Sequence, residues 1–76
     1  MKQYKHITIL ETEEAYDNKP VYDILNNKSG DSLGLIFYYK QWKKYVFTQT
    51  RTEDEIIFDN SCLRDIVDFL ENETTN

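Results

Sequence analysis

The sequence predicts an α+β fold, in which an antiparallel sheet of three to five strands carries one C-terminal helix packed on one face. Three observations predict it. The stretch 33–47 gathers aromatic residues into two runs around a polar tetrapeptide, and aromatic side chains suit half-buried strands, which indicates a β-hairpin. Turn residues precede this hairpin at 27–31. An apolar repeat of helical period follows it over 61–71.

The chain of 76 residues is short enough for one small domain, 1–76, and its single cysteine excludes an internal disulfide framework. We expect the core over about residues 20–71, a polar loop at 11–19 and a frayed tail at 72–76. A domain this small buries little apolar surface and has a thin stability margin, which favours a homodimer.

Alternating apolar residues and turn signals place the strands. In chain order, strands are expected over residues 4–10, 21–26, 33–39 and 44–50. Pro20 precedes the second of these, because a missing N–H is tolerated at the start of a strand. The charged residues 51–55 form a loop. The apolar run 56–58 is either a further short strand or an extended lead-in to the helix.

The strand 33–39 is apolar on both faces, which leaves two readings open. It is either a central strand covered on both sides or a strand with one covered side and one exposed aromatic side. Gly34 has no side chain to pack, so it predicts a bulge or the close approach of another backbone. The residues predicted to form the core are Ile24, Leu33, Leu35, Phe37, Phe47, Phe58, Leu63, Ile66, Val67 and Leu70, with Tyr22 and Val46 as further candidates.

The helix is predicted to begin after an N-cap at Ser61 or Asn60, with Asp59 as a third candidate. Its apolar stripe is formed by residues at helical spacing, flanked by Cys62 and Phe69. These stripe residues are Leu63, Ile66, Val67 and Leu70. The acidic residues of the opposite side are Asp65, Asp68 and Glu71.

The net charge of −5 is unevenly distributed. Residues 20–52 carry five basic and two acidic side chains, whereas residues 53–76 carry one basic and eight acidic ones. An acidic chain disfavours tight binding to duplex DNA, which needs many Lys and Arg contacts to phosphate. No apolar run reaches the roughly 20 residues that span a bilayer, so we expect a cytoplasmic protein with no membrane partner.

The motifs resemble a group of short, uncharacterised bacterial and phage proteins. Their pattern is a Lys-Ser-Gly turn, a Leu-Gly-x-Ile strand, an aromatic pair, Trp with a basic residue, Tyr-x-Phe, Phe, Cys-Leu and an Ile-x-x-Phe-Leu helix. Matching residues here run from Lys28-Ser29-Gly30 to Phe69-Leu70, within about 21–70. The departures are Tyr38 for Trp, Lys43 for Arg and Gln49 for Pro. The resemblance implies a phage or prophage origin and no known activity.

Catalytic chemistry finds little support in the sequence. His6 has no Cys or Asp at metal-ligand spacing, so neither a metal nor another cofactor is expected. Cys62 lies near a helix N-terminus, where the dipole can lower a thiol pKa, but the adjoining apolar residues favour a small core residue. Neighbouring carboxylates, as in 11–14 and 53–55, are typical of solvated runs. We therefore expect a protein that is not an enzyme.

The aromatic and basic hairpin is the main candidate for binding. Three readings are open: its aromatics form only core, they bind a protein, or they stack single-stranded bases with help from lysine. A protein partner is the leading prediction, in the manner of a phage inhibitor or adaptor, and a single-strand nucleic-acid module is the alternative. Candidate residues for either are Tyr38, Lys40, Trp42, Lys43 and Tyr45, with Lys44 and Arg51 added for nucleic acid. The acidic helix residues Asp65, Asp68 and Glu71 form a second candidate surface, for a basic partner.

Overall fold

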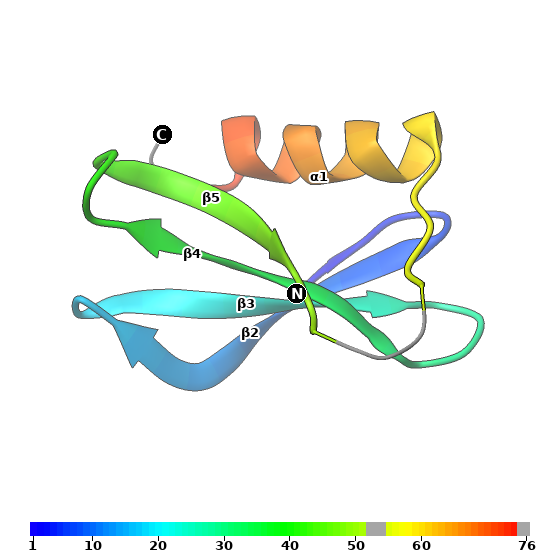
Figure 1. The fold of residues 1–76 in the computed structure, drawn as a ribbon, viewed down its shortest axis with the longest axis horizontal. Helices are drawn as coiled ribbons and strands as arrows, with labels where there is room; N and C mark the ends of the chain where they lie inside the picture. Colours follow the sequence, from blue (N-terminus) through cyan, green and yellow to red (C-terminus); the bar gives the residue numbers. More distant parts are fainter. Residues whose placement is uncertain (52–54, 75–76) are drawn as a thin grey trace.

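The computed structural model describes residues 1–51 and 55–74 and confirms the predicted α+β architecture. Five antiparallel strands form one sheet, and a single helix follows them (Figure 1). The elements are β1 (Lys2–Gln3), β2 (Ile7–Tyr16), β3 (Lys19–Asn26), β4 (Ser32–Tyr39), β5 (Lys44–Gln49) and α1 (Asn60–Asn72). Neighbouring strands in the sheet are also neighbours in sequence, so the sheet is a meander with β1 and β5 at its edges.

The prediction of a polar loop over residues 11–19 is wrong, because β2 continues to Tyr16 and β3 begins at Lys19. Only Asp17 and Asn18 form the turn between them, both with positive φ, as two-residue hairpin turns require. The second half of β2 is exposed on both sides, so it lacks the alternation that marks a strand. The core also begins earlier than residue 20, since Ile7 and Ile9 are fully buried.

The turn predicted at 27–31 connects β3 to β4. The Asn26 side-chain oxygen accepts hydrogen bonds from the backbone amides of Lys28 and Ser29, at 2.8 and 3.2 Å. Gly30 adopts a φ of 79°, which a residue without Cβ tolerates, and its amide donates to the Asn26 carbonyl at 2.7 Å. These turn residues fix the register of the central hairpin.

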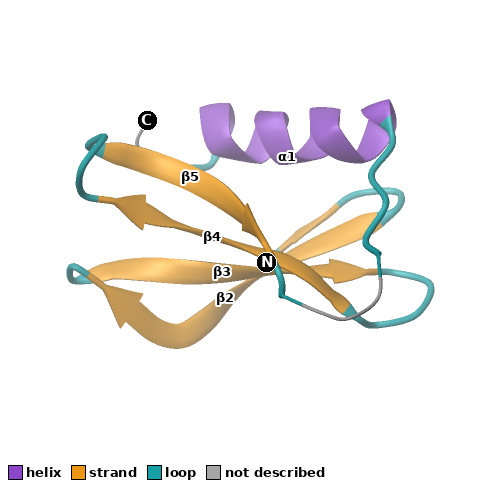
Figure 2. Ribbon diagram, in the orientation of Figure 1, coloured by secondary structure: helices purple, strands orange, loops and turns teal. Residues whose placement is uncertain are grey.

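One face of the sheet packs against α1, and the main core lies between them (Figure 2). The buried residues of this core are Ile7, Ile9, Ile24, Ile36, Tyr45, Ile66 and Phe69. Partly buried side chains that pack around it are Tyr4, Tyr22, Leu33, Tyr38, Phe47, Phe58, Cys62 and Leu70. A Cβ on Gly34 would collide with the Thr48 carbonyl oxygen and the Phe47 ring, which confirms the predicted close approach of another backbone.

Several predicted core positions are wrong. Leu35 is 36% exposed, Leu63 is 45% exposed and Val67 is 49% exposed. Phe37 lies on the sheet face that α1 does not cover, since it shares its side of β4 with Leu35. Within the helix, the stripe that meets the sheet therefore runs through Cys62, Ile66 and Phe69, with Leu70 at its border.

The N-cap of α1 is Asp59 rather than Ser61 or Asn60. Its carboxylate accepts a hydrogen bond from the Cys62 amide at 2.8 Å, which lowers the pKa of Asp59. The residues before it, Ile56–Phe58, form the extended lead-in and not a strand. The helix ends at Asn72, and the Thr74 hydroxyl donates to the Leu70 carbonyl at 2.6 Å. The rest of the predicted tail, 75–76, lies outside the described residues.

The two flanks of α1 differ in character. On one flank, Asp68 accepts a hydrogen bond from the Tyr4 hydroxyl at 2.7 Å, which ties the helix to the connection between β1 and β2. Leu63, Val67 and Leu70 lie on the other flank, because three- and four-residue steps keep side chains on one side of a helix. The strand that α1 contacts most extensively is β5.

The orientation of α1 can be tested at Ile66 and Leu63, whose side chains are isomers of each other. Ile66→Ala should destabilise the protein by about 2–5 kcal/mol, because Ile66 is 3% exposed and its removal leaves a cavity. Leu63→Ala removes the same number of carbons from an exposed position and should cost less than about 1 kcal/mol. Urea unfolding at low protein concentration measures both. Equal losses would contradict the observed orientation of the helix.

The Tyr4–Asp68 hydrogen bond should make stability depend on pH. It lowers the pKa of Asp68, so its stabilisation is complete above the ordinary carboxyl pKa of about 3.9 and disappears as pH falls through the lower folded value. Burial and the same bond raise the pKa of Tyr4, so the tyrosine contribution persists below about pH 10 and is lost in strong alkali.

Tyr4→Phe should therefore lower the free energy of unfolding at pH 7, and the difference from wild type should shrink at pH values well below 3.9. Tyr16→Phe is the matched control, because Tyr16 is 49% exposed on the other face. Urea titrations at both pH values make the comparison. A Tyr4→Phe deficit that stays constant into strong acid would contradict the role of the Asp68 carboxylate.

Candidate functional site

The sheet face opposite α1 remains uncovered by any described element and carries many apolar side chains, with Asp23 and Thr48 among them; it is here called the open face. Alternation along the paired strands assigns its members, since Phe37 pairs with Val46, and Leu35 pairs with Thr48 and Asp23. The apolar members are Leu10, Val21, Leu25, Leu35, Phe37, Tyr39 and Val46. Of these, Val21 is the most buried, at 6% exposure.

Four aromatic rings form a chain of edge-to-face contacts along the open face, here called the aromatic row. Tyr16 lies 5.8 Å from Phe37, Phe37 lies 6.3 Å from Tyr39, and Tyr39 lies 5.2 Å from Trp42, measured between ring centroids. Such T-shaped contacts are favourable and fix the rings against one another. Trp42 is nevertheless 66% exposed and Tyr16 is 49% exposed, so a rigid aromatic surface faces solvent.

The two hairpin turns at the ends of the aromatic row carry opposite charge. Residues 40–43 connect β4 to β5, and there Lys40 and Lys43 are exposed, followed by Lys44. No acidic side chain occurs anywhere in residues 32–50. At the other turn, Asp17 is exposed and Glu14 lines a shallow cavity beside Tyr16. The further residues lining this cavity are Ala15, Val21, Leu35 and Phe37.

The structure brings together three of the five hairpin residues predicted to bind, namely Lys40, Trp42 and Lys43. The other two, Tyr38 and Tyr45, lie on the opposite face and pack against each other at 5.7 Å. Tyr45 is only 6% exposed, belongs to the core and donates to the Pro20 carbonyl at 3.4 Å. Burial raises the pKa of Tyr45, as expected of a phenol removed from water.

The predicted acidic residues lie on α1, on the far side of the sheet from the aromatic row. Asp68 is committed to internal hydrogen bonds, because it accepts from Tyr4 and from the Asn72 amide at 2.8 Å. Asp65 is half-buried and Glu71 is exposed. The structure thus separates the acidic candidates from the hairpin candidates.

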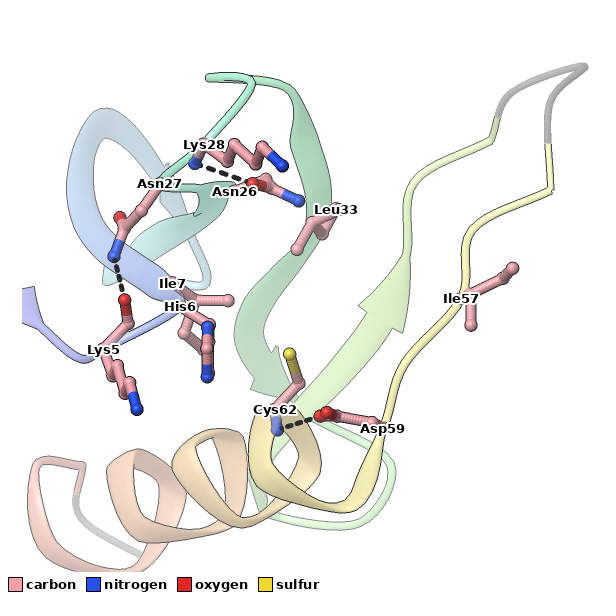
Figure 3. A pocket seen from close by; sticks show the side chains of 10 residues that line it. All are labelled: Lys5, His6, Ile7, Asn26, Asn27, Lys28, Leu33, Ile57, Asp59 and Cys62. Carbon is pink, nitrogen blue, oxygen red and sulfur yellow. Dashed lines mark hydrogen bonds between the residues drawn. The ribbon is translucent and has the colours of Figure 1, made fainter.

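A second cavity lies at the N-terminal end of α1 and contains Cys62 (Figure 3). The Cys62 sulfur points into it, and His6 and Asp59 also contribute to its lining. These three residue types could form a nucleophilic site, but burial raises the pKa of the Cys62 thiol, and its hydrogen bond with Asp59 raises it further. A catalytic cysteine needs the opposite shift, because the thiolate is the nucleophile. The raised pKa, together with the packing of Cys62 against the core, favours the small core residue expected from the sequence.

Sequence reasoning missed Tyr16, Phe37 and Tyr39 as members of the candidate site. Phe37 and Tyr39 belong to the exposed aromatic side that was one of the two readings of strand 33–39, and the structure selects that reading. No sequence pattern marked Tyr16 as a site residue, because it lies in the polar segment that was expected to be a loop. The pairing of Tyr16 with Lys19 places its ring beside β4 only once the hairpin has formed.

The state of Cys62 gives a direct chemical test. Because its pKa is raised in the folded protein, the thiolate fraction at pH 8 should be below that of an ordinary cysteine. The folded protein should therefore react with a thiol reagent several times more slowly than the same chain in concentrated urea. Stopped-flow absorbance measures both rates. A faster reaction in the folded state would identify an activated thiol and reopen the catalytic reading.

No family model, curated protein or solved structure matches this chain. The described residues include no helix with the length and apolar character needed to cross a membrane. Within residues 1–51 and 55–74 there is also no cluster of three or more His, Cys, Asp or Glu side chains suited to a metal ion.

Proposed function

We propose that this protein is a small, non-enzymatic interaction module that binds a protein partner through the open face of its sheet. The observation that carries the proposal is the aromatic row, which lies on the one face that α1 leaves uncovered. Tryptophan and tyrosine are enriched among the residues that contribute most to protein interfaces. Contiguous exposed apolar surface of this kind marks interaction sites on small soluble proteins.

The arrangement of charge defines the partner further. The open face is apolar around Phe37 and carries Asp23 beside Leu35, while a basic turn lies beside Trp42 and acidic side chains lie beside Tyr16. A matching surface has an apolar region opposite Phe37, carboxylates opposite Lys40 and Lys43, and a basic group opposite Glu14 and Asp17. Complementary charges of this kind set orientation and association rate more than affinity. An inhibitor or adaptor that acts on a host protein is the kind of module that we propose.

Single-stranded nucleic acid is the second candidate, favoured by one observation. The exposed Trp42 ring is surrounded in sequence by Lys40, Lys43 and Lys44, with no acidic residue between 32 and 50. Stacking of a base on an aromatic ring combined with lysine contacts to phosphate is how such strands are bound. Against this, the rings of the row meet edge to face, so their flat sides are partly occupied by neighbouring rings.

Binding should depend on the aromatic row. Affinity capture from host cells with the wild-type protein should recover a partner. Trp42→Ala and Leu35→Lys should each lose this partner or bind it at least about tenfold more weakly, because truncation at a hot spot costs above about 1–2 kcal/mol of binding free energy. The matched control is Ile57→Ala, because Ile57 is 79% exposed and lies outside the open face. Isothermal calorimetry with the purified partner gives the affinities. Equal binding by all variants would contradict the proposal.

Labelled single-stranded oligonucleotides separate the two candidates. A nucleic-acid module should bind them with an affinity that falls steeply as salt rises and should lose about 1–3 kcal/mol in Trp42→Ala. A protein-binding module should show no salt-dependent oligonucleotide binding above that of a control protein of equal charge. Fluorescence anisotropy over a range of salt concentrations makes the measurement.

A further inference from the structure

The shallow cavity beside Tyr16 is a concave site at one end of the open face. Its volume is about 220 Å³. Val21, which is 6% exposed, and Leu35 give it apolar walls, and the rings of Tyr16 and Phe37, with centroids 5.8 Å apart, complete much of its lining. Tyr16 and Leu35 remain 49% and 36% exposed, so a ligand can reach the cavity from solvent.

One carboxylate, that of Glu14, belongs to the lining of this otherwise apolar and aromatic cavity. The spacing of two residues places Glu14 and Tyr16 on the same side of β2. In the part of the chain that the structure describes, the Glu14 side chain takes part in no hydrogen bond or ion pair. The basic residue nearest to it in sequence, Lys19, is directed elsewhere, because its ammonium lies 4.8 Å from the centroid of the Tyr38 ring on the other face. The charge of Glu14 is therefore available to a ligand.

The lining selects a ligand that is apolar along its stem and positively charged at its tip. An apolar or aromatic side chain in the same space would cover the Glu14 carboxylate and leave it without a partner, which is costly. A phosphate group would be repelled by Glu14 and by the exposed Asp17 in the adjoining turn, which disfavours nucleic acid at this end of the open face. A guanidinium meets both requirements, because it stacks on aromatic rings, pairs with a carboxylate and is carried by a chain of methylenes.

We infer that this cavity binds an arginine side chain of the partner protein. The methylenes of the arginine pack against Val21 and Leu35, its guanidinium lies against the rings of Tyr16 and Phe37, and its N–H groups donate to the Glu14 carboxylate. Arginine is preferred to lysine, because a guanidinium is more weakly hydrated than an ammonium and loses less on leaving water. The inference rests on the proposed function and deepens it, since it names one group of the partner and the place where that group binds.

Blocked amino acids test the cavity without the partner. The probe is N-acetyl-arginine amide, and its counterpart is N-acetyl-citrulline amide, which has nearly the same shape and no charge. In a heteronuclear NMR titration of the full chain, the arginine probe should produce saturable shifts at the backbone amides of the residues that line the cavity. The citrulline probe should bind at least about threefold more weakly, because an exposed ion pair and an exposed cation–π contact each contribute modestly.

Two neighbouring glutamates provide a matched pair of variants. Glu14→Gln keeps the size of the side chain and removes its charge, so it should lower the affinity for the arginine probe to that for the citrulline probe. Glu13→Gln removes the same charge from an exposed residue that does not line the cavity, and it should leave the affinity unchanged. Equal binding of the probes by the wild type, equal losses in the variants or an absence of saturable shifts would overturn the inference.

The captured partner separates this inference from the proposed function. Glu14→Gln should weaken partner binding by at least about threefold, whereas Glu13→Gln should not change it. A partner that Trp42→Ala loses but that Glu14→Gln binds as tightly as the wild type would overturn the arginine site and leave the proposed function standing. A partner that binds Trp42→Ala, Glu14→Gln and the wild type equally would overturn both.

Discussion

A single helix can cover only one face of a sheet, and most features of this protein depend on which face α1 covers. Side chains alternate along each strand, so the choice buries every second residue and leaves the others to solvent. Ile36 is fully buried, whereas its neighbour Leu35 is 36% exposed. The contact between Phe69 and Tyr22, at 5.0 Å between ring centroids, helps to hold α1 on its face. The same contact leaves the aromatic row uncovered.

The strands and the helix could be predicted from the sequence, but the side of each element that faces the core could not. Turn residues and apolar runs are local signals, so the strands from residue 21 onward and the helix were expected near their observed positions. The strand 33–39 is apolar on both sides, so no pattern within it indicates which side meets the helix. A register shift between Ile24 and Leu25 also places Leu33 with the even-numbered residues, packed against the core, rather than with Leu35.

The helix shows the same limitation. Its apolar residues form an arc from Phe69 through Ile66 to Val67, which is wider than the surface that the sheet can cover. Sequence periodicity locates the centre of this arc at Leu63, Ile66 and Val67. The structure rotates it toward Phe69, because the Tyr4–Asp68 bond and the packing of Phe69 on Tyr22 act together. The apolar flank formed by Leu63 and Val67 stays exposed as a consequence of that rotation.

The candidate site illustrates which functional residues a sequence can reveal. Lys40, Trp42 and Lys43 are neighbours in one turn, so their grouping is visible without a structure. Tyr16 and Phe37 meet only through the pairing of β2 with β3 and of β3 with β4, which no local pattern encodes. The row as a whole is therefore a product of topology, and only its Trp42 end was predictable.

The placement of aromatic residues is unusual for a domain of this size when stability alone is considered. In 76 residues little apolar surface is available for a core, so each large side chain left in water is a loss of potential stabilisation. Tyr16 and Trp42 nevertheless remain largely exposed. Their rings are held in these positions by edge-to-face contacts, Tyr16 with Phe37 and Trp42 with Tyr39. A rigid exposed aromatic surface reduces the entropy lost on binding. The arrangement is costly for an isolated fold and advantageous for recognition, which is why the open face is the part of the molecule most readily explained by function.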